Sequence, residues 1–202
     1  MAGTGKGAVF GIQTVTLAEP VAGGYPTKWS GAGTYSFKAI VRDSVSFNDA
    51  VPSENDLYVE EVDEIYATLN SDDGSKGFTL DTYDLSQETY TALLGYYTNA
   101  SSTDGWIDEP TKIPALVKAV QIVTRDFGTD FPSKTFQWAK MKINVTRAGT
   151  IGKSGFPNFH LEFKQQANVG NDGNTVSGHR WKLTTNEVTS GGSATGGSAT
   201  GG

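Results

Sequence analysis

The chain has no cysteine and only two histidines. Without thiols it cannot form disulfides, thiolate zinc sites, iron–sulfur clusters or a cysteine nucleophile. The two histidines, His160 and His179, have no histidine partner at the spacing of metal ligands. The sequence therefore predicts neither a metal site nor a cofactor.

Long apolar runs and an excess of positive charge are also missing. No segment approaches the roughly 20 apolar residues of a membrane helix, so we expect no membrane association. The start, MAGTGKGAVFGIQTVTL, has one lysine and no long apolar stretch, unlike a secretory signal. The net charge of -6 argues against a protein that grips nucleic acid over a large area.

Glycine and aromatic residues are abundant: 25 Gly, 10 Phe, 8 Tyr and 4 Trp. This composition favours a turn-rich β architecture over a helical one. Residues 1–188 suit a single domain with an N-terminal arm. Residues 189–202 contain GGSAT twice and are expected to be a flexible tail, either a linker or tag scar or a natural low-complexity segment.

Alternating apolar residues predict most of the strands. In residues 135–147 the alternation changes parity near Ala139, which indicates a β-bulge. The strands at 57–69 and 77–83 are expected to be joined by the polar turn NSDDGSKG. The expected strands cover residues 35–47, 57–69, 77–83, 115–124, 135–147 and 159–163, with a last strand at Trp181 and Leu183. Residues 8–17 suit either a first strand or an extended arm.

One segment, DLSQETYTALLGYY, changes to helical spacing. Tyr90, Leu93, Leu94 and Tyr97 stand at i, i+3, i+4 and i+7, and Ser86 is a suitable N-cap. We therefore expect a mainly β fold, either a β-sandwich or a partly closed barrel of about seven or eight strands. One α-helix, over about residues 86–97, should flank it.

Motifs that carry chemistry are incomplete. GTGKG near the start lacks the spacing of a phosphate-binding loop, and the segments DDG and NDGN are typical of hairpin turns rather than calcium loops. The acidic run 54–64 includes Glu60, Glu61, Asp63 and Glu64, two of which could form a glycosidase pair. Their alternation is more typical of a solvated strand edge. We predict that the protein is not an enzyme.

Several aromatic residues fall in loops rather than on strands. Tyr25 and Trp29 lie in the Gly- and Pro-rich loop 19–34, and Trp106 lies in the long loop 99–114. Exposed aromatic residues in loops often mark a protein interface or a sugar-binding platform. The alternative is that the loops fold back and bury them.

The order of these elements resembles the major tail (tail tube) proteins of long-tailed bacteriophages. A Gly-rich arm, the acidic segment VEEVDEIYATL and a short strand precede DLSQETYTALLG, the segment that carries the resemblance. The resemblance implies a structural virion protein whose copies form hexameric rings that stack into a tube. Viral DNA would pass through it without specific binding. The implied partners are further copies and the tape measure, terminator and baseplate or tip proteins, in the virion tail and, during assembly, the host cytoplasm.

The resemblance also directs the choice of candidate residues. The arm 3–14 and the loops 19–34 and 99–114 are long enough to reach adjacent subunits, and sheet edges would pair between neighbours. The expected self-assembly residues are Phe10, Tyr25, Trp29, Trp106 and Ile107. The expected acidic residues of the lumen are Glu60, Asp63 and Glu64.

Two other functions stay open. One is a carbohydrate-binding β-sandwich module that uses Tyr25, Trp29 and Trp106 as a stacking platform. The other is a glycosidase that uses two carboxylates of the acidic run. The first predicts a monomer that binds glycans, and the second predicts a cleft containing a carboxyl group with a raised pKa.

Overall fold

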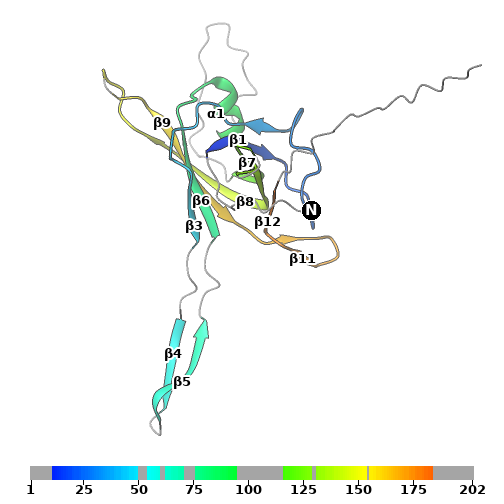
Figure 1. The fold of residues 1–202 in the computed structure, drawn as a ribbon, viewed down its shortest axis with the longest axis vertical. Helices are drawn as coiled ribbons and strands as arrows, with labels where there is room; N and C mark the ends of the chain where they lie inside the picture. Colours follow the sequence, from blue (N-terminus) through cyan, green and yellow to red (C-terminus); the bar gives the residue numbers. More distant parts are fainter. Residues whose placement is uncertain are drawn as a thin grey trace, which may run out of the picture.

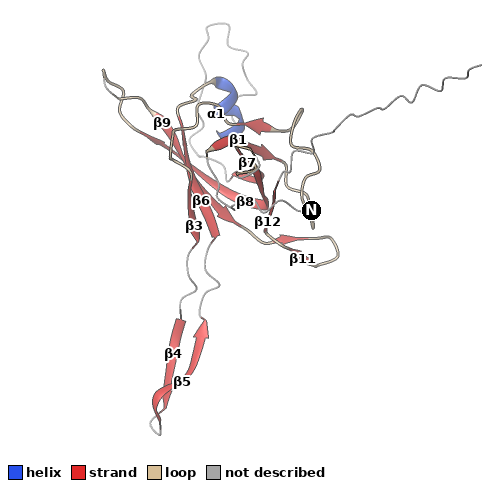
Figure 2. Cartoon of the chain, viewed as in Figure 1, coloured by secondary structure: helices blue, strands red, loops and turns tan. Residues whose placement is uncertain are grey.

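The computed structural model describes residues 11–49, 54–59, 62–70, 76–94, 116–128, 131–153 and 155–183, and only the backbone of 54–59 and 62–70. It is mainly β, with one helix, as predicted, and its main sheet does not close into a barrel (Figure 2). The elements are β1 (Ile12–Ala18), β2 (Tyr35–Ser36), β3 (Ser46–Asp49), β4 (Glu54–Val59), β5 (Val62–Asn70), β6 (Lys76–Thr82), α1 (Gln87–Leu94), β7 (Leu116–Thr124), β8 (Lys134–Ala148), β9 (Asn158–Gln165), β10 (Asn168–Val169), β11 (Thr175–Val176) and β12 (His179–Leu183) (Figure 1).

The main sheet is antiparallel and is built around the long strand β8. Its order is β2-β1-β7-β8-β9-β6-β3, and β12 also pairs with β8. The second half of β8 pairs with β9 and the first half pairs with β12. Between these halves, Gln166 N–H donates to the Lys140 carbonyl and Ala139 N–H donates to the Gly178 carbonyl. The chain thus follows one edge of β8 throughout, and the β10–β11 hairpin is an excursion from that edge.

The β-bulge predicted near Ala139 is present. Lys118 pairs with Met141 and Val120 pairs with Trp138, so β8 has one more residue than β7 between these pairs. Trp138 and Ala139 are consecutive and both are buried, as is Met141. The extra residue therefore keeps the large side chains on both sides of the bulge in the core.

Aromatic rings form the centre of the core. Phe78 stacks on Phe163, with ring centroids 4.2 Å apart, and lies 5.0 Å from the Trp138 ring. Phe159, Leu161 and Phe163 of β9 are all buried, as their alternation predicts. Removing each such side chain from water stabilises the fold by about 1.5–3 kcal/mol.

The helix α1 is anchored to the sheet by both apolar and polar contacts. Leu93 and Leu94 are buried, and the Thr89 N–H donates to Ser86 Oγ at 3.4 Å, so Ser86 is the N-cap. The buried Thr89 hydroxyl donates to Asp84 Oδ2 at 2.7 Å and lies 2.7 Å from the Tyr35 hydroxyl. The helix predicted over 86–97 is confirmed up to Leu94, and Tyr97 lies outside the described residues.

The strand predicted over residues 35–47 is wrong as a single element. Only its ends are strands, β2 and β3. Between them Ala39 and Asp43 have φ values of 48° and 60°, and Ser44 N–H donates to the Val41 carbonyl. Two left-handed residues interrupt an extended backbone, although the apolar alternation continues through them.

The strand predicted over residues 57–69 is also wrong, because the chain reverses within it. β4 and β5 form a separate two-stranded hairpin in which Val59 pairs with Val62. β6 pairs with β3 and β9 instead of β5. Glu60 and Glu61, between β4 and β5, lie outside the described residues. Because no Gly, Pro or Asn stands there, the pattern carries no turn signal. Figure 1 shows this hairpin extending away from the main sheet.

Candidate functional site

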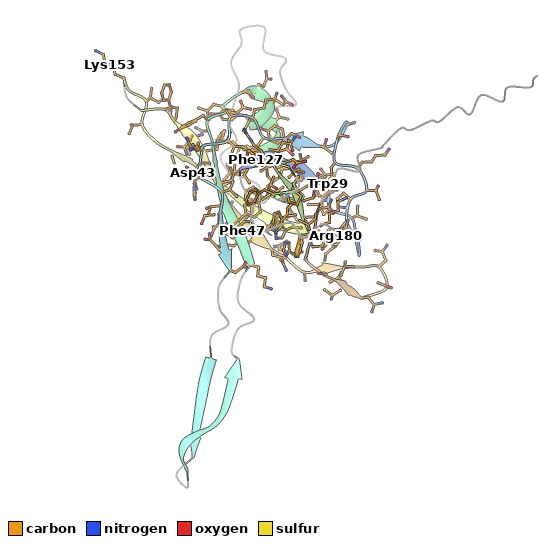
Figure 3. The ribbon with its side chains drawn as sticks, in the orientation of Figure 1. Trp29, Asp43, Phe47, Phe127, Lys153 and Arg180 are labelled. Atoms are coloured by element: carbon orange, nitrogen blue, oxygen red, sulfur yellow. The ribbon has the colours of Figure 1, made fainter. Side chains whose placement is uncertain are left out.

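Two of the predicted interface residues, Tyr25 and Trp29, line a groove together with the last strand. The loop that follows β1 supplies Tyr25 and Trp29, and β7, β8 and β12 supply the rest of the lining. The volume is about 740 Å³. Trp29 and Arg180, both labelled in Figure 3, are far apart in the sequence but line the same groove. The cationic groove, as it is named from here on, is lined by Tyr25, Pro26, Thr27, Trp29, Gln121, Thr135, Gln137, Arg180, Trp181 and Lys182.

Part of the lining is a row of polar residues that are paired across three neighbouring strands. Gln121 of β7 pairs with Gln137 of β8, which pairs with Arg180 of β12. One step along, Thr135 of β8 pairs with Lys182 of β12. Directly paired residues share a face of the sheet, and so do residues two apart on a strand. Arg180 and Lys182 therefore project from the same face.

The Arg180 guanidinium is held by two contacts. Its central carbon lies 3.8 Å from the centre of the Tyr25 ring, and Nε donates to Gln137 Oε1 at 2.8 Å. The Tyr25 hydroxyl donates to the Ser177 carbonyl at 2.6 Å, and burial raises the pKa of Tyr25 above its ordinary value. Tyr25 is therefore a neutral donor at physiological pH, and its ring stays under the guanidinium.

The cations of the groove have no carboxylate partner in the described part of the chain. Neither Arg180 nor Lys182 forms an ion pair there, and no Asp or Glu lines the groove. Trp181 is 58 % exposed, and the Lys134 ammonium lies 5.2 Å from its ring centre. Trp29 Nε1 is buried without a hydrogen-bond acceptor among the described residues. Arg180 and Lys182 thus offer positive charge and N–H donors in the groove, which suits an anionic partner.

A second groove, about 740 Å³ in volume, lies where the described chain begins. Gly11 lines it, next to apolar side chains that include Phe47 and Phe127, both labelled in Figure 3. Phe47 is 52 % exposed although its ring is 6.2 Å from that of Trp138. The apolar groove, as it is named from here on, is lined by Gly11, Ile12, Ile40, Val41, Arg42, Asp43, Val45, Phe47, Arg125 and Phe127.

The other predicted site residues fall mostly beyond what the structure describes. Phe10, which directly precedes the apolar groove in sequence, lies outside the described residues, as do Trp106, Ile107 and Glu60. Asp63 and Glu64 belong to β5, whose side chains are not described. The lumen position expected for these acidic residues stays a prediction.

Sequence reasoning missed Arg180 and Lys182. Their i, i+2 spacing on a predicted strand is a signal for two cations on one face. Nothing in the local pattern indicates that β12 pairs with the first half of β8, or that the loop after β1 lies against these strands. The groove depends on contacts between residues about 150 positions apart, such as the Tyr25–Ser177 hydrogen bond.

The histidines have different partners. His160 Nδ1 lies 2.6 Å from Asp81 Oδ1 on the neighbouring strand β6. His179 lies on the Trp138 ring, with centroids 4.8 Å apart, and burial lowers its pKa. Within the described ranges, no group of three His, Asp or Glu residues is arranged to hold a metal ion.

No protein-family model and no curated protein matches this chain. Within the parts of the chain that the structure describes, no helix is both long and apolar enough to span a membrane. The features that bear on function are the cationic groove, the unpaired strand edges and the β4–β5 hairpin.

Proposed function

We propose that this protein is a structural, self-assembling subunit whose copies form stacked rings, as in a bacteriophage tail tube. The β4–β5 hairpin is the observation that carries the proposal. Its strands pair only with each other among the described strands, and Figure 1 shows it away from the main sheet. A two-stranded hairpin alone is marginally stable in water. Contact with another molecule would supply the missing stabilisation, and in a self-assembling protein that molecule is a second copy.

The edges of the main sheet support the same proposal. β2 and β3 end the strand order, and β3 consists of four exposed residues. β12 has β8 as its only partner among the described strands, so its other edge is also unpaired. Unpaired edges are a liability in a monomer, and they become an interface when copies pair in a ring.

The remaining parts of the proposal rest on the resemblance to tail tube proteins. They are six copies in each ring, partners among the tape measure, terminator and baseplate or tip proteins, and a place in the virion tail after assembly in the host cytoplasm. The net charge of -6 is compatible with DNA that passes through the lumen without adhering, because like charges repel over about a Debye length. In this role the protein is not an enzyme.

Electron microscopy and sedimentation velocity of the full chain over a range of concentrations test the proposal. We expect rings or tubes with a central channel. A variant in which Asn-Gly replaces residues 50–75 connects β3 to β6 by a two-residue turn. It should remain folded and monomeric, whereas truncation after residue 188 should leave assembly unchanged. Monomers of the full chain at high concentration, or tubes formed by the hairpin-deleted variant, would contradict the proposal.

A carbohydrate-binding module is the second candidate. The observation in its favour is that Tyr25 and Trp29 line the same groove as the exposed Trp181. It predicts a monomer that binds a neutral oligosaccharide, with binding lost in Trp181→Ala. A glycan array on the full chain, followed by titration of that variant, separates this candidate from the tube subunit.

A further inference from the structure

The acidic charge of this protein is concentrated in one segment. Residues 54–70, which form β4, β5 and their connection, contain six of the 22 acidic residues and none of the 16 basic residues. The rest of the chain therefore carries 16 acidic and 16 basic residues and is formally neutral. The net charge of -6 is the charge of the β4–β5 hairpin.

The cationic groove is complementary in charge to this hairpin. It contains Arg180 and Lys182, has no acidic lining residue, and neither cation has a carboxylate partner in the described residues. Both cations belong to β12, whose second edge is unpaired there. An unpaired edge accepts an extended segment by backbone hydrogen bonds, and flanking side chains select which segment binds.

We propose that the acidic β4–β5 hairpin of one copy binds in the cationic groove of a second copy, along the free edge of β12. The hairpin carboxylates then neutralise Arg180 and Lys182. This inference rests on the proposed self-assembly and specifies one of its contacts. The hairpin of the same chain is not the occupant, since Figure 1 shows it pointing away from β12.

The geometry of Arg180 favours a carboxylate partner. The Tyr25 ring and the Gln137 side chain hold the guanidinium, and only Nε is used in the Gln137 hydrogen bond. Among the described residues, no hydrogen-bond partner is found for its two terminal nitrogens, which suit a bidentate carboxylate contact, and little side-chain entropy is lost because the guanidinium is already positioned.

The same geometry disfavours a neutral sugar in this groove. A sugar ring stacks on the open face of an aromatic side chain. Here the Arg180 guanidinium covers one face of Tyr25, and the Lys134 ammonium lies over Trp181. An anionic segment gains from these cations, whereas a neutral glycan would have to displace them.

A hairpin bound in the groove of a second copy changes the position expected for the acidic residues of the lumen. Glu60, Asp63 and Glu64 belong to the hairpin segment. If they contact the groove of a second copy, they do not line a channel. The two positions are alternatives, and charge reversal distinguishes them because only the groove contact depends on Arg180 and Lys182.

Charge reversal in the full chain is the test. One variant carries Arg180→Glu and Lys182→Glu, and the other carries lysine in place of the hairpin residues Glu60, Glu61, Asp63 and Glu64. Light scattering and sedimentation velocity should show association of each variant alone weakened at least about tenfold, since opposed like charges replace close ion pairs. An equimolar mixture, and a chain that combines both sets, should regain association because every contact is complementary again.

A control matched to the groove variant replaces two cations by glutamate elsewhere in the chain. Lys142→Glu with Lys153→Glu alters two exposed cations outside the groove and should associate as the unmodified chain does. Near-UV circular dichroism reports whether each variant is folded. If a single reversal perturbs folding, the combined variant still decides, because restored association requires the complementary contact.

Each outcome has a separate meaning. If the groove variant associates normally, the hairpin-to-groove contact is wrong and the proposed self-assembly stands. If the unmodified chain shows no association at any concentration, the proposed function itself fails. If the groove variant assembles but loses binding to a polyuronic acid oligosaccharide that the unmodified chain binds, the groove is an anionic-glycan site and the inference is overturned.

Discussion

Replacing Thr89 by valine should destabilise the protein more than any other single hydroxyl-to-methyl change on α1. The Thr89 hydroxyl is buried and lies 2.7 Å from Asp84 Oδ2, 2.7 Å from the Tyr35 hydroxyl and 3.1 Å from Ser86 Oγ. Valine keeps the β-branched shape and removes all three hydrogen bonds. Burial raises the pKa of Tyr35 to about 12, so its hydroxyl stays a neutral group and loses this partner inside the protein.

The magnitude follows from the type of each bond. A hydrogen bond to a charged group contributes about 1.5–3 kcal/mol and a neutral one about 1 kcal/mol, and the exposed Ser86 and half-buried Asp84 recover part of this from water. We therefore expect Thr89→Val to lower the free energy of unfolding by about 2–4 kcal/mol. The control is Thr91→Val, which makes the same change in helix propensity as Thr89→Val. The Thr91 hydroxyl is exposed and donates only to the Gln87 carbonyl, so the difference between the two variants measures the buried hydrogen bonds of Thr89.

Urea denaturation of the two variants at pH 7 measures this difference. The change should appear in the midpoint with an unchanged m-value, because the native surface is the same. A loss in Thr89→Val within about 0.5 kcal/mol of that in Thr91→Val would refute the reasoning, because it falls within the range of ordinary surface substitutions.

The same variant has a pH signature at Asp84. Burial alone would raise the pKa of Asp84, but hydrogen bonds from Thr89 and Ser86 outweigh it, and the pKa is lowered. The stabilisation from ionised Asp84 is thus present above its ordinary pKa and is lost as the pH falls through the lower folded-state pKa. The difference between Thr89→Val and the unmodified chain should shrink in that acidic range.

Two other substitutions test the packing of the sheet. A Cβ on Gly77 would lie 2.0 Å from the Phe163 carbonyl oxygen, so Gly77→Ala should lower the free energy of unfolding by about 1–3 kcal/mol in urea, whereas Gly152→Ala, with open space around its Cβ, should change little. Burial lowers the pKa of His179, so its stabilising contribution is present above the unfolded pKa of about 6.5 and is lost below it. The melting temperature of His179→Gln should therefore fall less between pH 7.5 and pH 5 than that of the unmodified chain, and equal losses would contradict this assignment.

Local patterns predicted the elements that depend on neighbours in sequence. The alternation of Phe159, Leu161 and Phe163 predicts β9, and all three are buried. The parity change at Ala139 predicts the bulge of β8, because side chains of a strand alternate between faces. The capped apolar spacing after Ser86 predicts α1. In each case the information lies within a few residues.

Tertiary contacts decided the rest. Apolar alternation continues from residue 35 to 47 and from 57 to 69, but the chain turns in both segments because long-range pairing outweighs local preference. The cationic groove needs β12 beside β8, and Tyr25 beside Arg180. Those contacts join segments more than 40 positions apart, and no periodicity encodes them. The sequence alone thus determined β9, the bulge of β8, the start of α1 and where the negative charge of the chain lies, and only the tertiary structure decided which cations face an unpaired edge.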